Sequence, residues 1–208
     1  MRSKSNLNSK SKIKVFNKSN LNRAEVICCS FTKLSPINEI PHALRAILVM
    51  NKSKIGKEKM MRCLVQRVLS ASVSVAGELI GSIDRGYLVL LGVKNTDTEA
   101  VSDKMLKKIL DARLFEDENG KTNLSIRDIS GSLLVVSQFT LYADTKKGNR
   151  PSFIQAGDPA HANALYEYFL KKAEEAGIPT SHGQFGADMK VSLVNDGPFT
   201  IMYDSDAT

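Results

Sequence analysis

Three polar side chains follow a wholly apolar stretch near the middle of the chain. Leu133–Val136 is rich in branched residues, which predicts a strand buried on both faces. Ser137, Gln138 and Thr140 come directly after this strand, with the aromatic side chain of Phe139 among them. Hydroxyl and amide groups at the rim of a buried strand are typical of a ligand pocket. The alternative is a strand end whose polar groups are satisfied by local hydrogen bonds.

Three cations follow this segment in a stretch of loop-like composition. Lys146, Lys147 and Arg150 lie between Asp144 and Pro151. Cationic side chains beside a polar rim favour an anionic ligand such as a phosphate. A solvated charged loop without a ligand explains the same composition, so both interpretations stay open.

A second informative stretch lies near the end of the chain, at Asn195–Thr200. Its Gly197-Pro198 pair predicts a turn that joins two strands. A proline that follows glycine is also where a cis peptide bond costs little. Such a unit exposes backbone carbonyls with no side chain in front of them. These carbonyls could hold an ammonium group or exclude a substituent by contact.

No set of residues for acid–base or nucleophilic catalysis can be assembled from the sequence. Thr140 and Thr200 could each act as a nucleophile, but neither has a base nearby in sequence. The three cysteines and three histidines lack the spacing of a metal site, so neither a metal nor another cofactor is expected. An enzyme of this composition would depend on positioning and on the substrate's own groups.

The basic residues are concentrated at one end of the 208-residue chain. Residues 1–60 contain 13 Lys and Arg against 3 Asp and Glu, whereas the rest contains 16 against 19. This balance excludes a uniformly basic nucleic-acid-binding domain. The apolar run Ala46–Met50 is too short to span a bilayer, so no membrane partner is expected.

Residues 1–60 have the composition of a disordered extension, rich in Lys, Ser and Asn. Three interpretations stay open: an organellar transit peptide, a translation start assigned too early, or a basic arm that binds RNA. The folded domain then spans residues 61–205.

Alternating apolar patterns from Met61 onward predict a sheet and two amphipathic helices. One helix follows Thr96–Glu99, which has the form of a capping box, and the other runs from Asp158-Pro159 to Gly177. Strands are predicted over Arg62–Val68, Ser70–Val75, Leu79–Ile83, Tyr87–Val93, Leu133–Val136, Met189–Val194 and Phe199–Tyr203. The predicted fold class is α+β, a single domain with an antiparallel-rich sheet and a barrel-like core.

Two motifs resemble the signatures of the D-aminoacyl-tRNA deacylases, the D-tyrosyl-tRNA deacylase family. Ser137–Thr140, followed by Leu141–Asp144, is similar to their first motif, and Asn195–Thr200 is similar to their second, the Gly-cisPro motif. The segments Met61–Val68 and Phe185–Met189 are also similar to the family. The resemblance covers the chain from residue 61 to about 204, and residues 1–60 have no counterpart in the usual member.

The resemblance implies a homodimer with its active sites at the subunit interface. Gly197 and Pro198 of one subunit would enter the pocket of the other, where their carbonyls reject an L-amino acid by steric contact. Phe185 and Met189 would flank the terminal adenosine, and Arg67 would hold the Gly-Pro unit; core packing is the alternative for Phe185. The implied catalytic segment is Ser137, Gln138, Phe139 and Thr140, and the implied substrate-binding residues are Gly197, Pro198, Thr200, Phe185, Met189 and Arg67.

The implied reaction is hydrolysis of the ester in D-aminoacyl-tRNA, and in glycyl-tRNA mischarged on tRNA-Ala, in the cytoplasm or, if residues 1–60 are a transit peptide, in an organelle. The expected mechanism uses the substrate's 2′-hydroxyl to assist water, with backbone N–H groups around Gln138 and Phe139 stabilising the oxyanion. Two alternatives remain: a non-catalytic nucleic-acid module that binds through residues 1–60, and an esterase with a threonine nucleophile.

Overall fold

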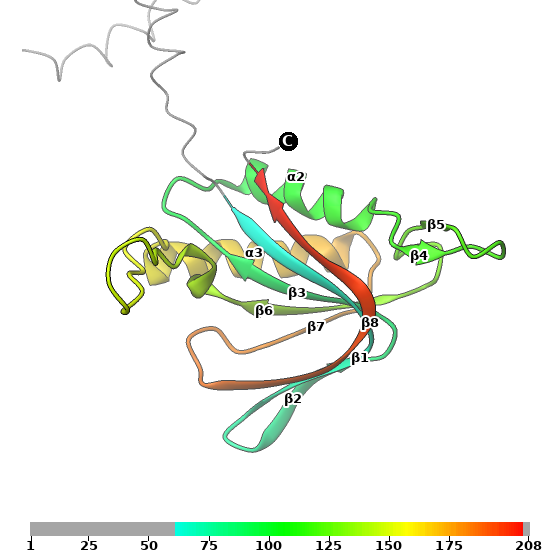
Figure 1. Ribbon diagram of the computed structural model, residues 1–208, viewed down its shortest axis with the longest axis horizontal. Helices are drawn as coiled ribbons and strands as arrows, with labels where there is room; N and C mark the ends of the chain where they lie inside the picture. Colours follow the sequence, from blue (N-terminus) through cyan, green and yellow to red (C-terminus); the bar gives the residue numbers. More distant parts are fainter. Residues whose placement is uncertain (1–60, 206–208) are drawn as a thin grey trace, which may run out of the picture. The chain divides into compact units, whose positions relative to one another are not determined.

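A computed structural model describes residues 61–205, which form a curved sheet covered by two helices (Figure 1). The predictions for residues 1–60 lie outside the described residues. The elements in chain order are β1 (Arg62–Val75), β2 (Glu78–Ile83), β3 (Gly86–Gly92), α2 (Glu99–Leu110), β4 (Phe115–Glu116), β5 (Thr122–Leu124), β6 (Ser132–Ser137), the 3-10 helix η4 (Phe139–Tyr142), α3 (Pro159–Glu175), β7 (Thr180–His182) and β8 (Met189–Asp204).

The long strand β1 organises the six-stranded sheet. It pairs antiparallel with β3 through its first half, with β2 through its second half, and with β8 along most of its length. β6 lies parallel to β3, and β7 lies parallel to β6. The Ser181 hydroxyl donates to the Ser82 carbonyl at 2.8 Å, which links β7 to β2. The sheet therefore nearly closes into the predicted barrel, with most of its pairings antiparallel.

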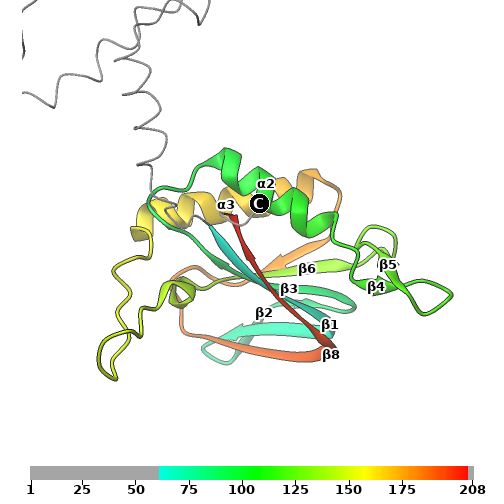
Figure 2. The ribbon, with the colours of Figure 1, turned by 45° about the horizontal axis from the view of Figure 1, so that its top comes forward.

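Strand β6 separates two hydrophobic clusters. Leu133 and Val135 pack with both helices, whereas Leu134 and Val136 pack inside the curved sheet with residues such as Val68. All four apolar side chains of β6, Leu133–Val136, are fully buried, as the apolar run predicted. Figure 2 shows the two helices together on one face of the sheet. This packing fixes the end of β6, where the polar motif begins.

The helix boundaries follow local chemistry. The Asp158 side chain accepts a hydrogen bond from the Ala160 N–H at 3.0 Å, which caps α3 as predicted. Gly177 has a φ of +75°, the conformation that ends a helix most readily with glycine. Thr98 also lies at a helix start, but its side chain makes no capping hydrogen bond.

Two strand predictions were wrong at their junctions. Arg62–Val68 and Ser70–Val75 form one continuous strand, as do Met189–Val194 and Phe199–Tyr203. Both halves of β8 pair with β1, so the residues between them do not reverse the chain. Instead they form a bulge in β8. Gln66 pairs with Thr200 and Val68 pairs with Asn195, so an advance of two residues along β1 corresponds to five residues along β8.

Candidate active site

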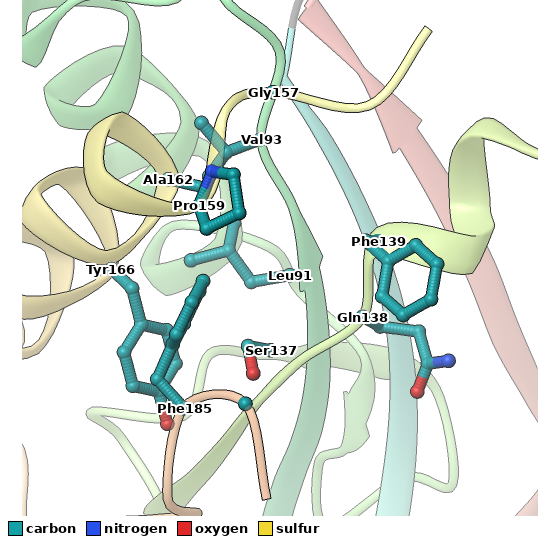
Figure 3. Close-up of a pocket in the computed structure, with 11 residues that line it drawn as sticks. Leu91, Val93, Ser137, Gln138, Phe139, Gly157, Pro159, Ala162, Tyr166 and Phe185 are labelled. Atoms are coloured by element: carbon teal, nitrogen blue, oxygen red, sulfur yellow. The ribbon is translucent and has the colours of Figure 1, made fainter. Parts of the chain in front are cut away.

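A cavity of about 220 Å³ lies between the end of β6 and helix α3. Figure 3 shows Tyr166 and Phe185 together on one side, Gln138 and Phe139 on the other, and Ser137 between them. The cavity walls come from β3, β6, η4, α3 and the turn before β8. The lining residues are Leu91, Val93, Ser137, Gln138, Phe139, Gly157, Pro159, Ala162, Tyr166, Phe185 and Gly186.

The first motif is held in place by its own hydrogen bonds. The Gln138 N–H donates to the Leu91 carbonyl at 2.7 Å, which ties the motif to β3. The Gln138 side-chain amide donates to the Thr140 hydroxyl oxygen. Phe139 begins the 3-10 helix η4, so its N–H and that of Thr140 have no acceptor within that helix. These two amides are therefore the donors that this segment can offer to a ligand.

The Phe139 ring is exposed despite its size. It is 57% exposed and meets the edge of the Phe153 ring, with 5.2 Å between the ring centroids. An aromatic side chain left this open beside a cavity favours contact with a ligand or with another protein surface.

The opposite wall depends on Tyr166, which the sequence did not single out. Its hydroxyl lies 2.9 Å from the Val135 carbonyl oxygen and 3.0 Å from that of Gly183, and donates to this pair. Burial raises the pKa of the Tyr166 phenol, so it keeps the proton that it donates. The Tyr166 ring also supports Phe185, with 5.9 Å between centroids. Tyr166 thus connects β6 to the turn that carries Phe185.

Arg67 supports the second motif from beneath. Only 4% of this residue is exposed, and its Nε lies 2.9 Å from an Asp196 carboxylate oxygen and 3.1 Å from the Asp196 carbonyl oxygen. Its Nη1 donates to the Leu114 carbonyl at 2.5 Å, and the guanidinium covers the Phe199 ring at 4.2 Å. Arg67 therefore holds both sides of the bulge against the body of the domain.

The tip of the bulge is exposed and is not part of the cavity of its own chain. The Gly197-Pro198 peptide bond is cis, and both residues are exposed. Neither residue lines the cavity of the same chain. Asn195 donates its side-chain amide to the Arg67 carbonyl at 2.8 Å and to the Phe199 carbonyl at 3.3 Å, which fixes the base of the tip.

Four other predicted site residues are also not among those that line this cavity: Arg67, Thr140, Met189 and Thr200. The Thr200 hydroxyl accepts a hydrogen bond from the Gln66 side chain at 3.3 Å across the β1–β8 pair. Met189 packs against the hydrophobic cluster inside the curved sheet. The structure thus brings together Ser137, Gln138, Phe139 and Phe185, while Met189, Thr200 and the Gly-Pro tip stand apart from them.

The cavity has no acid–base machinery of its own. None of its described lining residues carries a carboxylate, an imidazole or an amine. Among residues 61–205, no group of three or more His, Cys, Asp or Glu could hold a metal ion, and no helix there is long and apolar enough to cross a bilayer. The arrangement can bind, orient and donate hydrogen bonds, and a threonine nucleophile here would lack a base from the cavity wall.

The residues that line this cavity lie within a segment that matches a known protein family. The family model described as D-Tyr-tRNA(Tyr) deacylase matches residues 64–204. The chain belongs to this family. The resemblance inferred from the two motifs is therefore confirmed, and with it the assignment to the deacylases, enzymes that hydrolyse an ester.

Curated members of the family match nearly along their entire length. The D-aminoacyl-tRNA deacylase of Lacticaseibacillus casei (strain BL23) is 53% identical over 147 residues, which are 71% of this chain and 99% of the relative. That of Aeromonas hydrophila subsp. hydrophila is 57% identical over 140 residues, which are 67% of this chain and 97% of the relative.

Two solved structures are similar to this chain in fold. The c-Myc DNA Unwinding Element Binding Protein has a TM-score of 0.65 and 43% identity, and the match covers 68% of this chain and 97% of that one. A probable eukaryotic D-amino acid tRNA deacylase has a TM-score of 0.62 and covers 70% of this chain and 99% of that one. At 18% identity the second match shows the fold alone.

Proposed function

We propose that this chain hydrolyses the ester bond of D-aminoacyl-tRNA, and of glycyl-tRNA mischarged on tRNA-Ala, and releases the free amino acid. Family membership and identities of 53–57% to curated D-aminoacyl-tRNA deacylases support the D-aminoacyl activity. Glycine is the natural second substrate of a filter that rejects by side-chain clash, because it has no side chain. The reaction belongs where translation occurs, in the cytoplasm or in an organelle if residues 1–60 direct the chain there.

One observation carries the stereochemical part of the proposal: the Gly197-Pro198 tip is exposed and lies outside the cavity of its own chain. A cavity walled by Ser137, Phe139 and Phe185 has room for a substrate but no element that tests chirality. The tip of a second copy supplies that element if it enters the cavity. Backbone carbonyls on a braced tip collide with an L side chain and leave space for a D side chain or for hydrogen.

Exposed apolar side chains support association with a second copy. Apolar side chains that lie together on the surface are typical of interaction sites, and Phe139 and Phe153 are in contact beside the cavity. Ile154, for example, is 92% exposed, near the cavity-facing motif in sequence. The exposed set is Leu69, Leu79, Ile80, Phe139, Phe153, Ile154, Leu193, Val194 and Met202.

The chemistry is assisted by the substrate itself. The 2′-hydroxyl of the terminal ribose helps a water molecule attack the ester carbonyl, since the cavity wall supplies no base. The N–H groups of Phe139 and Thr140 stabilise the oxyanion that forms. The Gln138 N–H, which the sequence analysis included among the donors, is already donated to Leu91, so its part is to fix the motif.

The rest of the tRNA end has candidate partners beside the cavity. Phe185 presents an aromatic face on which the terminal adenine can stack. Lys146, Lys147 and Arg150 are all exposed in the loop after the first motif and can meet phosphates of the 3′ end.

Subunit mixing tests the proposal. One variant carries Gly197→Ala, which obstructs the tip, and the other carries Phe139→Pro, which removes an oxyanion donor from the cavity. Co-expressed chains should recover roughly a quarter of wild-type activity, because about half of the dimers are mixed and each has one intact site. If the mixture is no more active than the better parent, the tip does not act in its neighbour's pocket.

A second candidate is nucleic-acid binding without catalysis. It is favoured by the printed name of the 43%-identical structure, a DNA-unwinding-element binding protein. The described domain argues against it as the main activity, because residues after 60 carry more acidic than basic side chains. A gel shift with DNA, performed with and without residues 1–60 and beside a deacylation assay, separates the two functions.

A third candidate, a threonine nucleophile, is tested by an aminoacyl-tRNA whose terminal ribose lacks the 2′-hydroxyl. Substrate-assisted hydrolysis should fail on this substrate, whereas a threonine esterase should still cleave it.

A further inference from the structure

The first described residue, Met61, is fixed in the core of the domain. Its side chain is fully buried, and its carbonyl accepts a hydrogen bond from the Ser205 N–H at 3.1 Å. Its backbone N–H lies close enough to the carboxylate of Asp97, a residue that is only 2% exposed, to help lower the pKa of that acid. The nitrogen of Met61 therefore has a defined position beside a buried acid.

This acid is incompletely satisfied by the groups around it. One Asp97 oxygen accepts from the Lys94 N–H at 2.7 Å, but its Oδ1 has no hydrogen-bond partner among residues 61–205. Electrostatic interactions with His161 and Lys94 lower the pKa of Asp97, and the buried Nε2 of His161 also lacks a hydrogen-bond partner among these residues. Burial outweighs these contacts and raises the pKa of Asp97. A buried carboxylate normally has a cation or a full set of donors.

A free amino group on Met61 would complete this site. An α-ammonium has three N–H donors and a positive charge, whereas the amide of a longer chain offers one neutral donor. We infer that the working polypeptide begins at Met61 and that Asp97 is the buried acceptor of its α-ammonium group. Residues 1–60 are then absent from the working protein, because translation starts at Met61 or because the segment is removed.

The lengths of the relatives agree with this inference. The 145 matched residues of the Stutzerimonas stutzeri deacylase are 100% of that protein but 70% of this chain. Natural deacylases of this size therefore consist of the matched region alone, and a chain that begins at Met61 is expected to fold.

The decisive experiment compares three forms of the protein: the full chain, the chain that begins at Met61, and that shorter chain with its α-amino group acetylated. Acetylation removes the charge at constant length. The free-amino form should have a folding equilibrium constant about tenfold or more above the acetylated form, because hydrogen bonds to charged groups are the strong ones. Asp97→Asn should abolish this difference.

A matched control is Asp117→Asn, in the hairpin turn between β4 and β5. Asp117 also accepts backbone N–H groups, from Asn119 and Lys121, but it is only partly buried. Its substitution should leave unchanged the ratio of folding equilibrium constants between the free-amino and acetylated forms of the shorter chain. Equal stability of the free-amino and acetylated forms would contradict the inferred ion pair between the Met61 α-ammonium group and Asp97. This comparison does not require the Asp97 variant to fold.

Mass spectrometry of the protein isolated from its own cells tests the start site independently. We expect an N-terminal peptide that begins at Met61. A mass that retains residues 1–60 in the active protein would contradict the inference, and would do so even if the deacylase activity is as proposed.

Discussion

The two motifs of this domain are built in opposite ways. The first lies at the end of β6, among fully buried strands, and its polar groups face the cavity of its own chain. The second is a bulge in β8 that leaves Gly197 and Pro198 exposed. One motif forms the wall of a pocket, and the other leaves two backbone units exposed outside the pocket of its own chain. This difference is what a site shared between two subunits requires.

An arginine of β1 supports each motif. Arg62 donates to the Leu141 carbonyl at 2.7 Å and contacts Asp204 at 3.2 Å, so it ties the first motif to the end of β8. Arg67 ties the second motif to Leu114. The strand that organises the sheet therefore also positions both halves of the proposed site.

The largest effect is expected from Phe139→Pro. Proline removes the N–H of this residue, and the first position of a helix tolerates proline well. The rate of D-tyrosyl-tRNA hydrolysis should fall about 10²–10³-fold, the usual cost of one oxyanion donor. The control Phe139→Ala keeps the N–H and should lose much less. Equal losses in both variants would assign the effect to the ring and remove the oxyanion role from this motif.

Gly197→Ala tests the presented tip. A Cβ added here would have only the Asn195 side-chain oxygen near it, at 3.7 Å, so the domain accommodates it. If the tip acts in a neighbour's pocket, as we propose, the same methyl group should displace the substrate, and a misplacement of about 1 Å can cost roughly 100-fold in rate. The free energy of unfolding should change by less than about 0.5 kcal/mol. Full activity in this variant would show that the tip does not contact substrate.

Arg67→Met compares the supports of the two motifs. The substitution leaves the Leu114 carbonyl and the Asp196 carboxylate without their buried partner, which should cost about 2 kcal/mol in the free energy of unfolding. Arg62→Met should cost less, because the Arg62 side chain is more exposed. Denaturant titration measures both. A reversed order would mean that the bulge is not held mainly by Arg67.

Phe185→Ala tests whether the terminal adenine of the tRNA stacks on this wall of the cavity. Loss of a stacking surface costs about 1–3 kcal/mol per base, so KM should rise roughly tenfold with little change in kcat. Core packing alone predicts instead a loss of stability with no selective change in KM. Steady-state kinetics beside thermal unfolding distinguishes these outcomes.

The smallest effects are expected from Thr140→Ala and Thr200→Ala. Both hydroxyls accept side-chain hydrogen bonds from glutamines, and neither is given a nucleophilic role here. Each variant should keep activity within about tenfold of wild type, since the loss is that of one hydrogen bond. A loss of about three decades with substrate binding intact would establish a nucleophile in that motif.

Much of the fold could be predicted because the signals are local. The apolar run in β6, the proline at the start of α3 and the glycine after its end each determine structure within a few residues. The parallel pairing of β6 with β3 and β7 could not be predicted in this way, because it depends on which distant strands meet. The continuity of β8 was missed because a Gly-Pro pair predicts a turn whether or not a long partner strand lies beside it.

In the site, too, features with a local sequence signal were predicted and features that depend on long-range contacts were not. The first motif was predicted from the change from apolar to polar residues at the end of one strand. Tyr166 was missed because it lies beside Leu165 on a helix face that already looked like ordinary core. Its hydrogen bonds reach β6 and the turn before β8, and no sequence spacing reveals such long-range contacts.

The most direct test of the account measures hydrolysis of D-tyrosyl-tRNA and L-tyrosyl-tRNA side by side, with glycyl-tRNA as a third substrate. We expect the D-ester and the glycyl ester to be cleaved at least about 100-fold faster than the L-ester, because a steric clash with backbone is hard to relieve. Similar kcat/KM values for the two enantiomers would contradict it.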